Sequence, residues 1–209
     1  MPIQATDIKK ALKAVSATMD AHKDELVALD AHSGDGDLGL SMSAGYRAVV
    51  TAADSSEERD LGRLMLALSK AFNEAAPSSL GTITSVGMMG MAKALKGTEE
   101  ATLAQFAAAM DAGLANIMEK AKSKPGERTI LDSLHPGIQA LRQHAGEDAK
   151  AAWRAAADAA AAGCEETRTM MPVHGRAAYY GDKTQGHLDG GAVVGKLLFE
   201  SLAHFAETA

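Results

Sequence analysis

The sequence predicts an all-α protein, and three observations lead to this prediction. Of the 209 residues, 46% are hydrophobic and only 4% are aromatic. The core must therefore be built from Ala, Leu, Val and Met, which are mostly good helix formers. Apolar residues recur at spacings of three and four along most of the chain, as on one face of a helix. No segment of useful length shows the two-residue alternation of a half-buried strand.

The first expected helix begins at Thr6, a residue type preferred at helix N-caps. It leads into a loop rich in Asp and Gly, Asp30–Gly39. The apolar positions of this helix follow at helical spacing and are Ile8, Leu12, Val15 and Met19.

Seven further helices are expected after that loop, with Pro and Gly marking several of their ends. The last one follows a polar, Gly-rich loop at Met171–Gly191 and ends near Ala206. The other six are expected at about Leu40–Ala53, Glu57–Ala75, Ser79–Leu95, from Thr98 to just before Lys124, Thr129–His144 and Glu147–Thr169. Eight helices joined mostly by short loops predict antiparallel neighbours in one bundle. No linker divides the chain, so residues 1–209 are expected to form one domain.

Composition excludes several classes of protein. With 21 Lys and Arg against 27 Asp and Glu, the net charge is −6, which argues against a nucleic-acid or anionic-membrane partner. The single cysteine, Cys164, excludes an internal disulfide, fits a reducing compartment and is expected to be a buried apolar residue. Neither a signal peptide nor an apolar run of about 18 residues is found, so we expect a cytoplasmic protein.

Two glycine-rich stretches resemble nucleotide motifs without meeting their structural requirements. The spacing G-x-G-x-x-G occurs at Gly34–Gly39, but a helix precedes it and two carboxylates interrupt it, whereas a dinucleotide fingerprint follows a strand. Gly190–Leu197 nearly matches a Walker A loop, but Leu197 stands where the Mg²⁺-binding Ser or Thr belongs. We interpret this second stretch as a glycine-rich helix start.

The acidic loop carries the strongest chemical signal. Asp30, Asp35 and Asp37 fall within eight residues, and Gly34 and Gly36 allow the backbone to turn so that the carboxylates converge. Like charges this close are unfavourable unless a cation or proton intervenes, and carboxylate oxygens suit Mg²⁺ or Mn²⁺. The alternative is a solvated Asx turn that caps the next helix. That helix begins with Ser41 and Ser43 in its first turn, which makes its N-terminus an anion site and predicts a phosphorylated ligand.

Other loops fit this picture, each with a structural alternative. Ser78–Thr82 starts a helix with small and hydroxyl residues, which suits either a phosphate cradle or plain N-capping. The Met171–Gly191 loop combines a cation, an imidazole and a carboxylate (Arg176, His187 and Asp189) with glycines, as in a ligand lid or a solvent-facing loop. Three residues of the sixth helix, Asp132, His135 and Arg142, are expected on a solvated or ion-paired surface. The methionine stripe Met88, Met89 and Met91 is expected in the core.

Four ordered segments resemble the DhaL family, the nucleotide-binding subunit of dihydroxyacetone kinases, also called the DAK2-type domain. The resemblance covers essentially the whole chain. The segments are Leu29–Gly39 (LDAHSGDGDLG), Ala76–Thr82 (APSSLGT), Lys124–Asp132 (KPGERTILD) and His174–Gly181 (HGRAAYYG) followed by Gly186–Ala192 (GHLDGGA).

The resemblance implies a barrel of eight antiparallel helices and a nucleotide site at its loops. It implies that Asp30, Asp35 and Asp37 hold two Mg²⁺ ions, which bind the phosphates of ADP or ATP. The residues that the resemblance assigns to the nucleotide are Leu38, Ser41, Ser78, Ser79, Leu80, Gly81, Thr82, Gly126, Thr129, Ile130, Gly175, Arg176, Asp189 and Gly190.

The resemblance also implies a partner. A separate DhaK-type subunit binds dihydroxyacetone or a related short-chain ketose, and the two subunits dock so that the γ-phosphate reaches the sugar hydroxyl. Isolated subunits of this family are often homodimers. Some members instead keep ADP as a bound coenzyme that a phosphocarrier (DhaM-type) protein recharges, and some regulate a transcription factor. Related DAK2-type domains also occur in fatty-acid kinases, with extra regions that this chain lacks.

The chain departs from the family pattern at three points. Many phosphocarrier-dependent members carry His after the third aspartate, whereas this chain has Leu38, which disfavours the phosphocarrier donor. The family's Ser-Gly segment is Leu80-Gly81 here, and its frequent Asp-Pro-Gly is Asp189-Gly190-Gly191.

Overall fold

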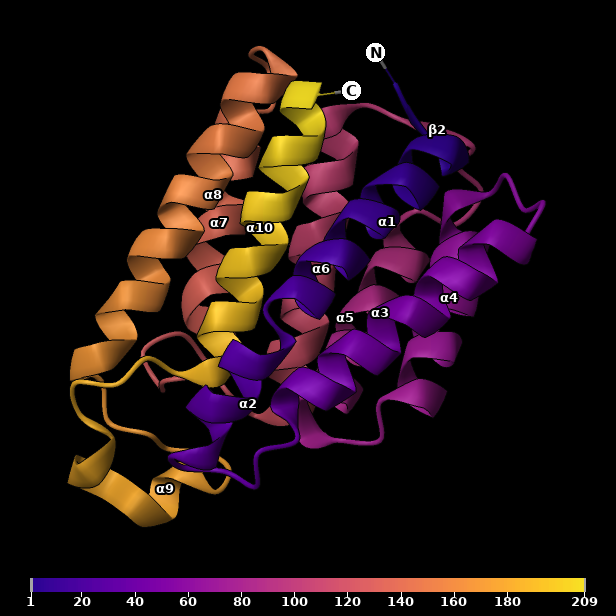
Figure 1. The fold of residues 1–209 in the computed structure, drawn as a ribbon. Helices are drawn as coiled ribbons and strands as arrows, with labels where there is room; N and C mark the ends of the chain where they lie inside the picture. Colours follow the sequence, from indigo (N-terminus) through magenta and orange to yellow (C-terminus); the bar gives the residue numbers. More distant parts are fainter. Residues whose placement is uncertain (1, 209) are drawn as a thin grey trace.

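Eight long helices run alternately up and down around a common axis in the computed structural model, which describes residues 2–208 (Figure 1). Each helix packs against its neighbours in chain order, and the last closes the ring on the first. The eight are α1 (Ala5–Ala21), α3 (Leu38–Ser55), α4 (Leu61–Ala75), α5 (Ser79–Ala94), α6 (Leu103–Ala121), α7 (Leu131–His144), α8 (Ala149–Glu166) and α10 (Gly190–Thr208). The predicted all-α class, with eight antiparallel helices around the ring, is confirmed.

Two more α-helices and four short elements complete the described part of the chain. Helix α2 (Lys23–Ala31) continues α1 after a break at His22. The break is confined to one residue, because the N–H of His22 still donates to the Thr18 carbonyl. Helix α9 (Ala177–Tyr180) lies within the long loop that the sequence analysis expected to lack helices. The short elements are the strands β1 (Ile3–Gln4) and β2 (Glu100–Ala101) and the 3₁₀ turns Thr167–Thr169 and Gly181–Thr184.

Several predicted helix starts are wrong by one to five residues because the capping residue differs. Helix α1 starts before Thr6, and Gln4 occupies its N-cap position. Helix α4 starts at Leu61, since the carboxylate of Asp60 accepts the N–H of Arg63. Helix α6 starts after Thr102, whose hydroxyl accepts the N–H of Gln105 in a capping box.

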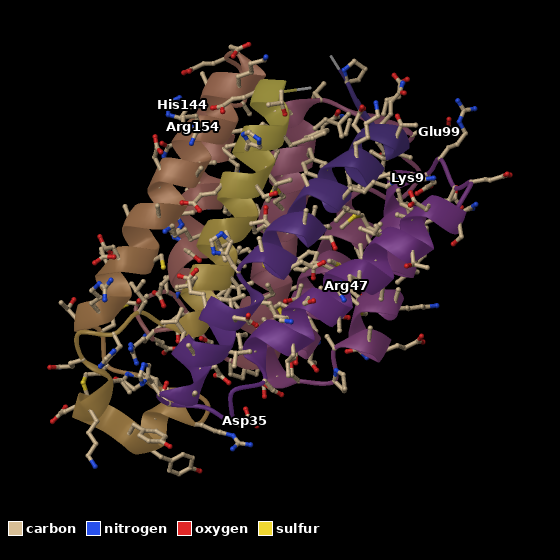
Figure 2. The ribbon with its side chains drawn as sticks, in the orientation of Figure 1. Lys9, Asp35, Arg47, Glu99, His144 and Arg154 are labelled. Carbon is tan, nitrogen blue, oxygen red and sulfur yellow. The ribbon has the colours of Figure 1, made fainter. Side chains whose placement is uncertain are left out.

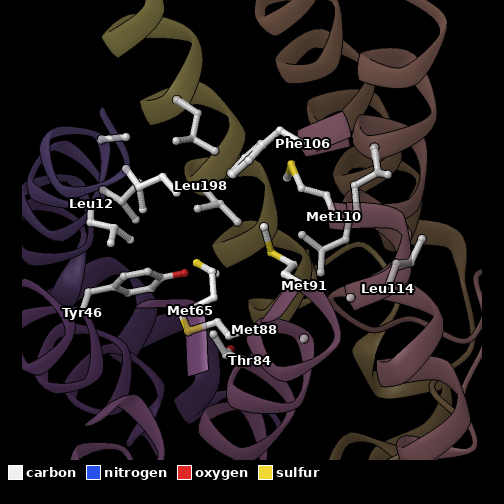
Figure 3. Close-up of a pocket in the computed structure, with 18 of the residues that line it drawn as sticks. Leu12, Tyr46, Met65, Thr84, Met88, Met91, Phe106, Met110, Leu114 and Leu198 are labelled. Carbon is white, nitrogen blue, oxygen red and sulfur yellow. The ribbon is translucent and has the colours of Figure 1, made fainter. Parts of the chain in front are cut away.

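The helices enclose an apolar lumen. A cavity of about 230 Å³ lies inside the ring, and Tyr46, Met88, Met91 and Phe106 are among the side chains that line it (Figure 3). Methionine suits such a lining because its thioether adapts to irregular space. The core assignment is confirmed for Met88, which is buried, whereas Met89 of the same stripe is 39% exposed.

The two ends of the barrel differ in what they carry. The described termini and the β1–β2 pair lie at one end, and the turns that precede α3, α5, α7 and α10 lie at the other (Figure 1). The second end, which we call the loop end, holds the four segments that carry the family resemblance. None of the helices within residues 2–208 combines the length and the apolar character needed to cross a membrane.

Candidate functional site

Three aspartates converge at the loop end, as the sequence analysis expected. Asp30 ends α2, Asp35 lies in the following turn, and Asp37 immediately precedes α3. One oxygen from each carboxylate lies within 4.8 Å of those from the other two. Figure 2 shows Asp35 at the tip of this turn. An all-oxygen set of this kind fits the ligand preference of Mg²⁺.

Glycines make this convergence possible. The carboxylate of Asp30 accepts the N–H groups of Gly36 at 2.8 Å and of Asp37 at 3.2 Å, which folds the turn around it. A Cβ atom at Gly34 would lie 2.2 Å from Asp30 Oδ1, so only glycine leaves room for the carboxylate. Gly36 has a φ of +75°, a conformation that residues with side chains rarely adopt.

The electrostatics of the cluster favour a cation. Burial, together with the negative charges of Asp35 and Asp30, raises the pKa of the Asp37 carboxyl above its ordinary value. One countercharge is present, because Arg176 Nη2 lies 2.6 Å from Asp35 Oδ2. Asp37 occupies the N-cap position of α3 but makes no side-chain capping bond, which leaves its carboxylate free for another ligand.

The start of α3 offers backbone groups to an anion. Helix α3 begins at Leu38, two residues before the predicted Leu40, so the first free N–H groups belong to Leu38 and its neighbours. The side chain of Leu38 is buried, and a Cβ at Gly190 would lie 2.6 Å from its Cδ2. Leu38 can therefore meet a ligand only through its backbone. The N–H of Ser41 is used within the helix, since it donates to the Asp37 carbonyl at 2.9 Å.

The segment Ser78–Thr82 is confirmed as a helix start. Ser78 is the N-cap of α5, because its Oγ accepts the N–H of Gly81 at 3.1 Å, as the capping alternative predicted. Gly81 is packed so closely on Ala76 that it has no room for a side chain. Ser79 and Thr82 remain exposed. Among residues 2–208, no hydrogen bond or ion pair joins this segment to the aspartates.

The turn before α7 is organised by Asp132, whose role the sequence analysis missed. Asp132 is 4% exposed, and its carboxylate accepts the N–H groups of Gly126 at 2.5 Å and Thr129 at 2.6 Å. The prediction of a surface position was therefore wrong. The spacing of Thr129 and Asp132 is that of a capping box and could have revealed the bond. Arg142 does lie on the surface as expected, paired with Asp111 at 2.7 Å.

The side chain of Ile130 is buried and lines the lumen, so only its backbone remains for a ligand. It lies beside the start of α10, where a Cβ at Gly191 would be 3.1 Å from the Ile130 N–H nitrogen. The turn before α7 and the start of α10 are therefore packed against each other at the loop end.

The Met171–Gly191 loop folds back over the aspartate turn. Its Gly175 has a φ of +64°, and the next residue, Arg176, forms the ion pair with Asp35. A second contact is the hydrogen bond between His174 Nε2 and Glu127 Oε2 at 2.6 Å, which lowers the pKa of the Glu127 carboxyl. These contacts attach the loop to two neighbouring turns, an arrangement that fits the lid interpretation.

Asp189 ends this loop and caps α10. Its carboxylate accepts the N–H of Ala192 at 2.8 Å, and its own N–H donates to Thr167 Oγ1 at 3.0 Å. Burial raises the pKa of Asp189 to about 6, although the Ala192 N–H and the charge of Arg128 act in the opposite direction. Cys164, also buried as predicted, has its pKa raised by burial to about 11 and is a thiol at neutral pH.

Fold and site together define a helical-barrel protein with one end suited to a cation and an anionic ligand. Comparison with known proteins agrees: the family model described as the DAK2 domain matches residues 32–204. The chain belongs to the DAK2 domain family. The matched range begins just after Asp30 and includes the other residues of the candidate site.

The similar proteins differ in how much of their own length this chain matches. The ADP-binding subunit DhaL of the PEP-dependent dihydroxyacetone kinase of Escherichia coli is 25% identical over 205 residues, which covers 97% of this chain and 98% of that protein. The L-erythrulose kinase of Pectobacterium atrosepticum is 28% identical and matches 93% of this chain, but only 35% of its own length.

The fold also matches a solved structure, the dihydroxyacetone kinase from C. freundii in complex with AMP-PNP and Mg²⁺. The TM-score is 0.74 at 24% identity, over 98% of this chain. The chain spans about a third of the length of that crystallised protein, 34%. This likeness supports the eight-helix barrel fold.

Proposed function

We propose that this chain is the nucleotide-binding subunit of a two-component kinase for dihydroxyacetone or a related short-chain ketose. The observation that carries the proposal is the convergence of Asp30, Asp35 and Asp37 beside the N-terminus of α3. The proposal assigns residues 1–209 to one nucleotide-binding domain in the cytoplasm. A DhaK-type partner supplies the ketose, and the isolated chain is expected to form a homodimer.

The three aspartates would hold Mg²⁺, two ions in this proposal. When bound, Mg²⁺ neutralises charge on the phosphate oxygens, which is the main requirement of phosphoryl transfer besides positioning. The first N–H groups of α3 and α5 point a positive helix end toward the phosphates of ADP or ATP. The turns at Gly126–Ile130, Gly175–Arg176 and Asp189–Gly190 complete the walls of the nucleotide site.

Arg176 acts in this proposal as a movable countercharge. It pairs with Asp35 in the structure, and both side chains are exposed, at 65% and 45%. A guanidinium released from Asp35 would be close enough to donate hydrogen bonds to the phosphate oxygens. The loop that carries Arg176 would then exclude water from the phosphates as it closes.

One comparison favours a phosphocarrier protein in place of ATP as the source of the phosphoryl group. The relative from Escherichia coli, matched over 98% of its length, is named a PEP-dependent kinase subunit that binds ADP. In that case the nucleotide would remain bound and a phosphocarrier would recharge it. Leu38, which stands where many phosphocarrier-dependent members carry His, disfavours this second donor.

Reconstitution distinguishes these proposals. The chain is mixed with a DhaK-type partner and several short ketoses, and phosphorylated ketose is measured with ATP alone or with a phosphocarrier relay. Turnover with ATP supports the first donor, and turnover only with the relay supports the second. A chain carrying Asp158→Asn, at an exposed position of α8, should behave as wild type. Absence of turnover with both donors and every ketose would contradict the proposed kinase.

A further inference from the structure

A small polar cleft lies beside the aspartate turn and has no assigned role. Its volume is about 80 Å³. The groups that line it include His32 and Ser33 from the aspartate turn, Lys183 and His187 from the long loop, and Arg128 from the turn before α7. Because a water molecule needs roughly 10–15 Å³ of such space, the cleft has room for a ligand of a few heavy atoms. Drug-sized ligands and nucleotides need several times more, about 300 Å³ or above.

The lining of this cleft is basic. Four of its side chains are Arg, Lys or His, and no carboxylate is among the lining residues. This is a local exception in a chain of net charge −6. Within residues 2–208, the side chains of Lys183, His32 and His187 make no hydrogen bond or ion pair. The two imidazole rings lie side by side, with centroids 5.1 Å apart and planes inclined by 34°.

Arg128 is the buried member of the set. It is only 4% exposed, and its Nε and Nη2 atoms donate to the carbonyls of Thr167, Thr184 and His187 at 2.8–3.0 Å. These bonds fix the cleft wall but bring no negative charge. No carboxylate within residues 2–208 lies in ion-pair contact with its guanidinium, and Nη1 has no hydrogen-bond partner there. Asp189 is the negative charge that acts on Arg128, but it forms no ion pair with the guanidinium, and burial still lowers the pKa of Arg128. A bound anion would give this buried charge a direct partner.

We propose that this cleft binds a single tetrahedral oxyanion, either inorganic phosphate or the phosphoryl group of a phosphate monoester. Lys183 Nζ, the imidazole N–H groups and the Ser33 hydroxyl supply donors, and Arg128 supplies the buried positive charge. The cleft shares its turns with the proposed nucleotide site but is lined by different side chains, none of which is assigned to the metal or the nucleotide. Because His32 and Ser33 belong to the turn that carries Asp30 and Asp35, an anion bound here would brace that turn.

The test is a calorimetric titration of the whole chain with inorganic phosphate, in a chelating buffer without divalent cation or nucleotide. Under these conditions the aspartate cluster repels phosphate, so the outcome is independent of the proposed kinase function. We expect saturable binding at one site. Lys183→Ala and His187→Ala should each weaken it by about five- to tenfold, since each removes one charge-assisted donor. Lys10→Ala, at an exposed position of α1, should leave it unchanged.

Two arms sharpen the result. A simple phosphate monoester is titrated in parallel. Equal affinity for phosphate and the monoester indicates that the site recognises only the phosphate oxygens, and tighter binding of the monoester identifies the ester as the ligand. Imidazole NMR resonances of His32 and His187 should shift with phosphate in the wild-type chain, which provides a readout that needs no variant. Absence of saturable binding, or equal binding by wild type and both variants when all are folded, would overturn the proposal.

Discussion

The two ends of the barrel satisfy their polar groups in opposite ways. At the end that holds the termini, polar groups pair with each other: Asp60 accepts the N–H groups of Arg63 and Gly97, and Arg154 pairs with Glu207 at 2.6 Å. At the loop end, three carboxylates crowd together, and the N-cap residue of α3, Asp37, makes no side-chain capping bond. Most of the positive-φ residues are also there, including Gly36, Gly126 and Arg128.

This difference indicates where the molecule is built for stability and where it is built for binding. Caps and ion pairs at the terminal end contribute to folding in the absence of any ligand. The carboxylate repulsion at the loop end opposes folding until a cation compensates it. The following predictions test this division, beginning with the largest effect.

Asp37→Asn should lower Mg²⁺-dependent affinity for ADP by about a hundredfold or more, because it removes one of three charged ligands for the cation. The ligand-free variant should be at least as stable as wild type, since the substitution also removes like-charge repulsion. Calorimetry with ADP and Mg²⁺, together with thermal unfolding, checks both parts. A variant that binds normally, or that unfolds at a clearly lower temperature, would contradict the assignment. Asp158→Asn is the matched control.

Asp189 should make the ligand-free protein less stable as pH rises. Its pKa is about 6 in the folded chain and near 3.8 ordinarily, so the folded state holds the proton through this window while the unfolded state loses it. The contribution of Asp189 to stability is therefore greatest below pH 4, falls between pH 4 and 6, and is lower by about 3 kcal/mol above pH 6.

Urea unfolding of wild type and Asp189→Asn at pH 4 and pH 7 measures this effect. Asn retains the capping oxygen but does not titrate. Relative to the variant, wild type should lose stability between the two pH values. A difference between the two proteins that does not change with pH would show that the Asp189 pKa is not raised.

Gly34→Ala should weaken Mg²⁺ binding by about tenfold. The added Cβ would lie 2.2 Å from Asp30 Oδ1 and would therefore displace that carboxylate. Gly146→Ala provides the contrast, since a Cβ there meets nothing within 4 Å. Direct titration with Mg²⁺ compares the two variants. Equal affinities would show that the close contact at Gly34 does not position the ligand.

Asp60→Ala tests the terminal end and should have the smallest effect. Loss of this N-cap should lower the free energy of unfolding by about 1 kcal/mol and leave the affinity for ADP and Mg²⁺ unchanged. The pKa of Asp60 is lowered by its bond from the Arg63 N–H, so this contribution is lost as pH falls through that lowered pKa. Weaker nucleotide binding by this variant would break the proposed separation of the two ends.

Much of the fold could be predicted from the sequence, because the helical spacing of apolar residues reports directly on burial. Ring closure by α10 on α1 and the one-residue break at His22 could not, since neither changes that spacing. Helix starts were less accurate where two capping residues stood close together, as at Thr98 and Thr102.

The aspartate cluster was predictable because its members are close in sequence and separated by glycine. Contacts between distant segments were not, such as the Arg128 bonds to carbonyls 39, 56 and 59 residues away. The same holds for Asp35 and Arg176, which meet only because the long loop folds back across α2. Such pairings depend on the assembled loop end and leave no periodic signal in the sequence.

The central claim is that the loop end binds a nucleotide through metal held by Asp30, Asp35 and Asp37. The most direct measurement is the affinity of the wild-type chain for ADP, determined with Mg²⁺ and again with a chelator in its place. The account predicts saturable binding with Mg²⁺ and a loss of affinity of about a hundredfold or more without it. Equal affinity in both conditions, or no binding in either, would contradict it.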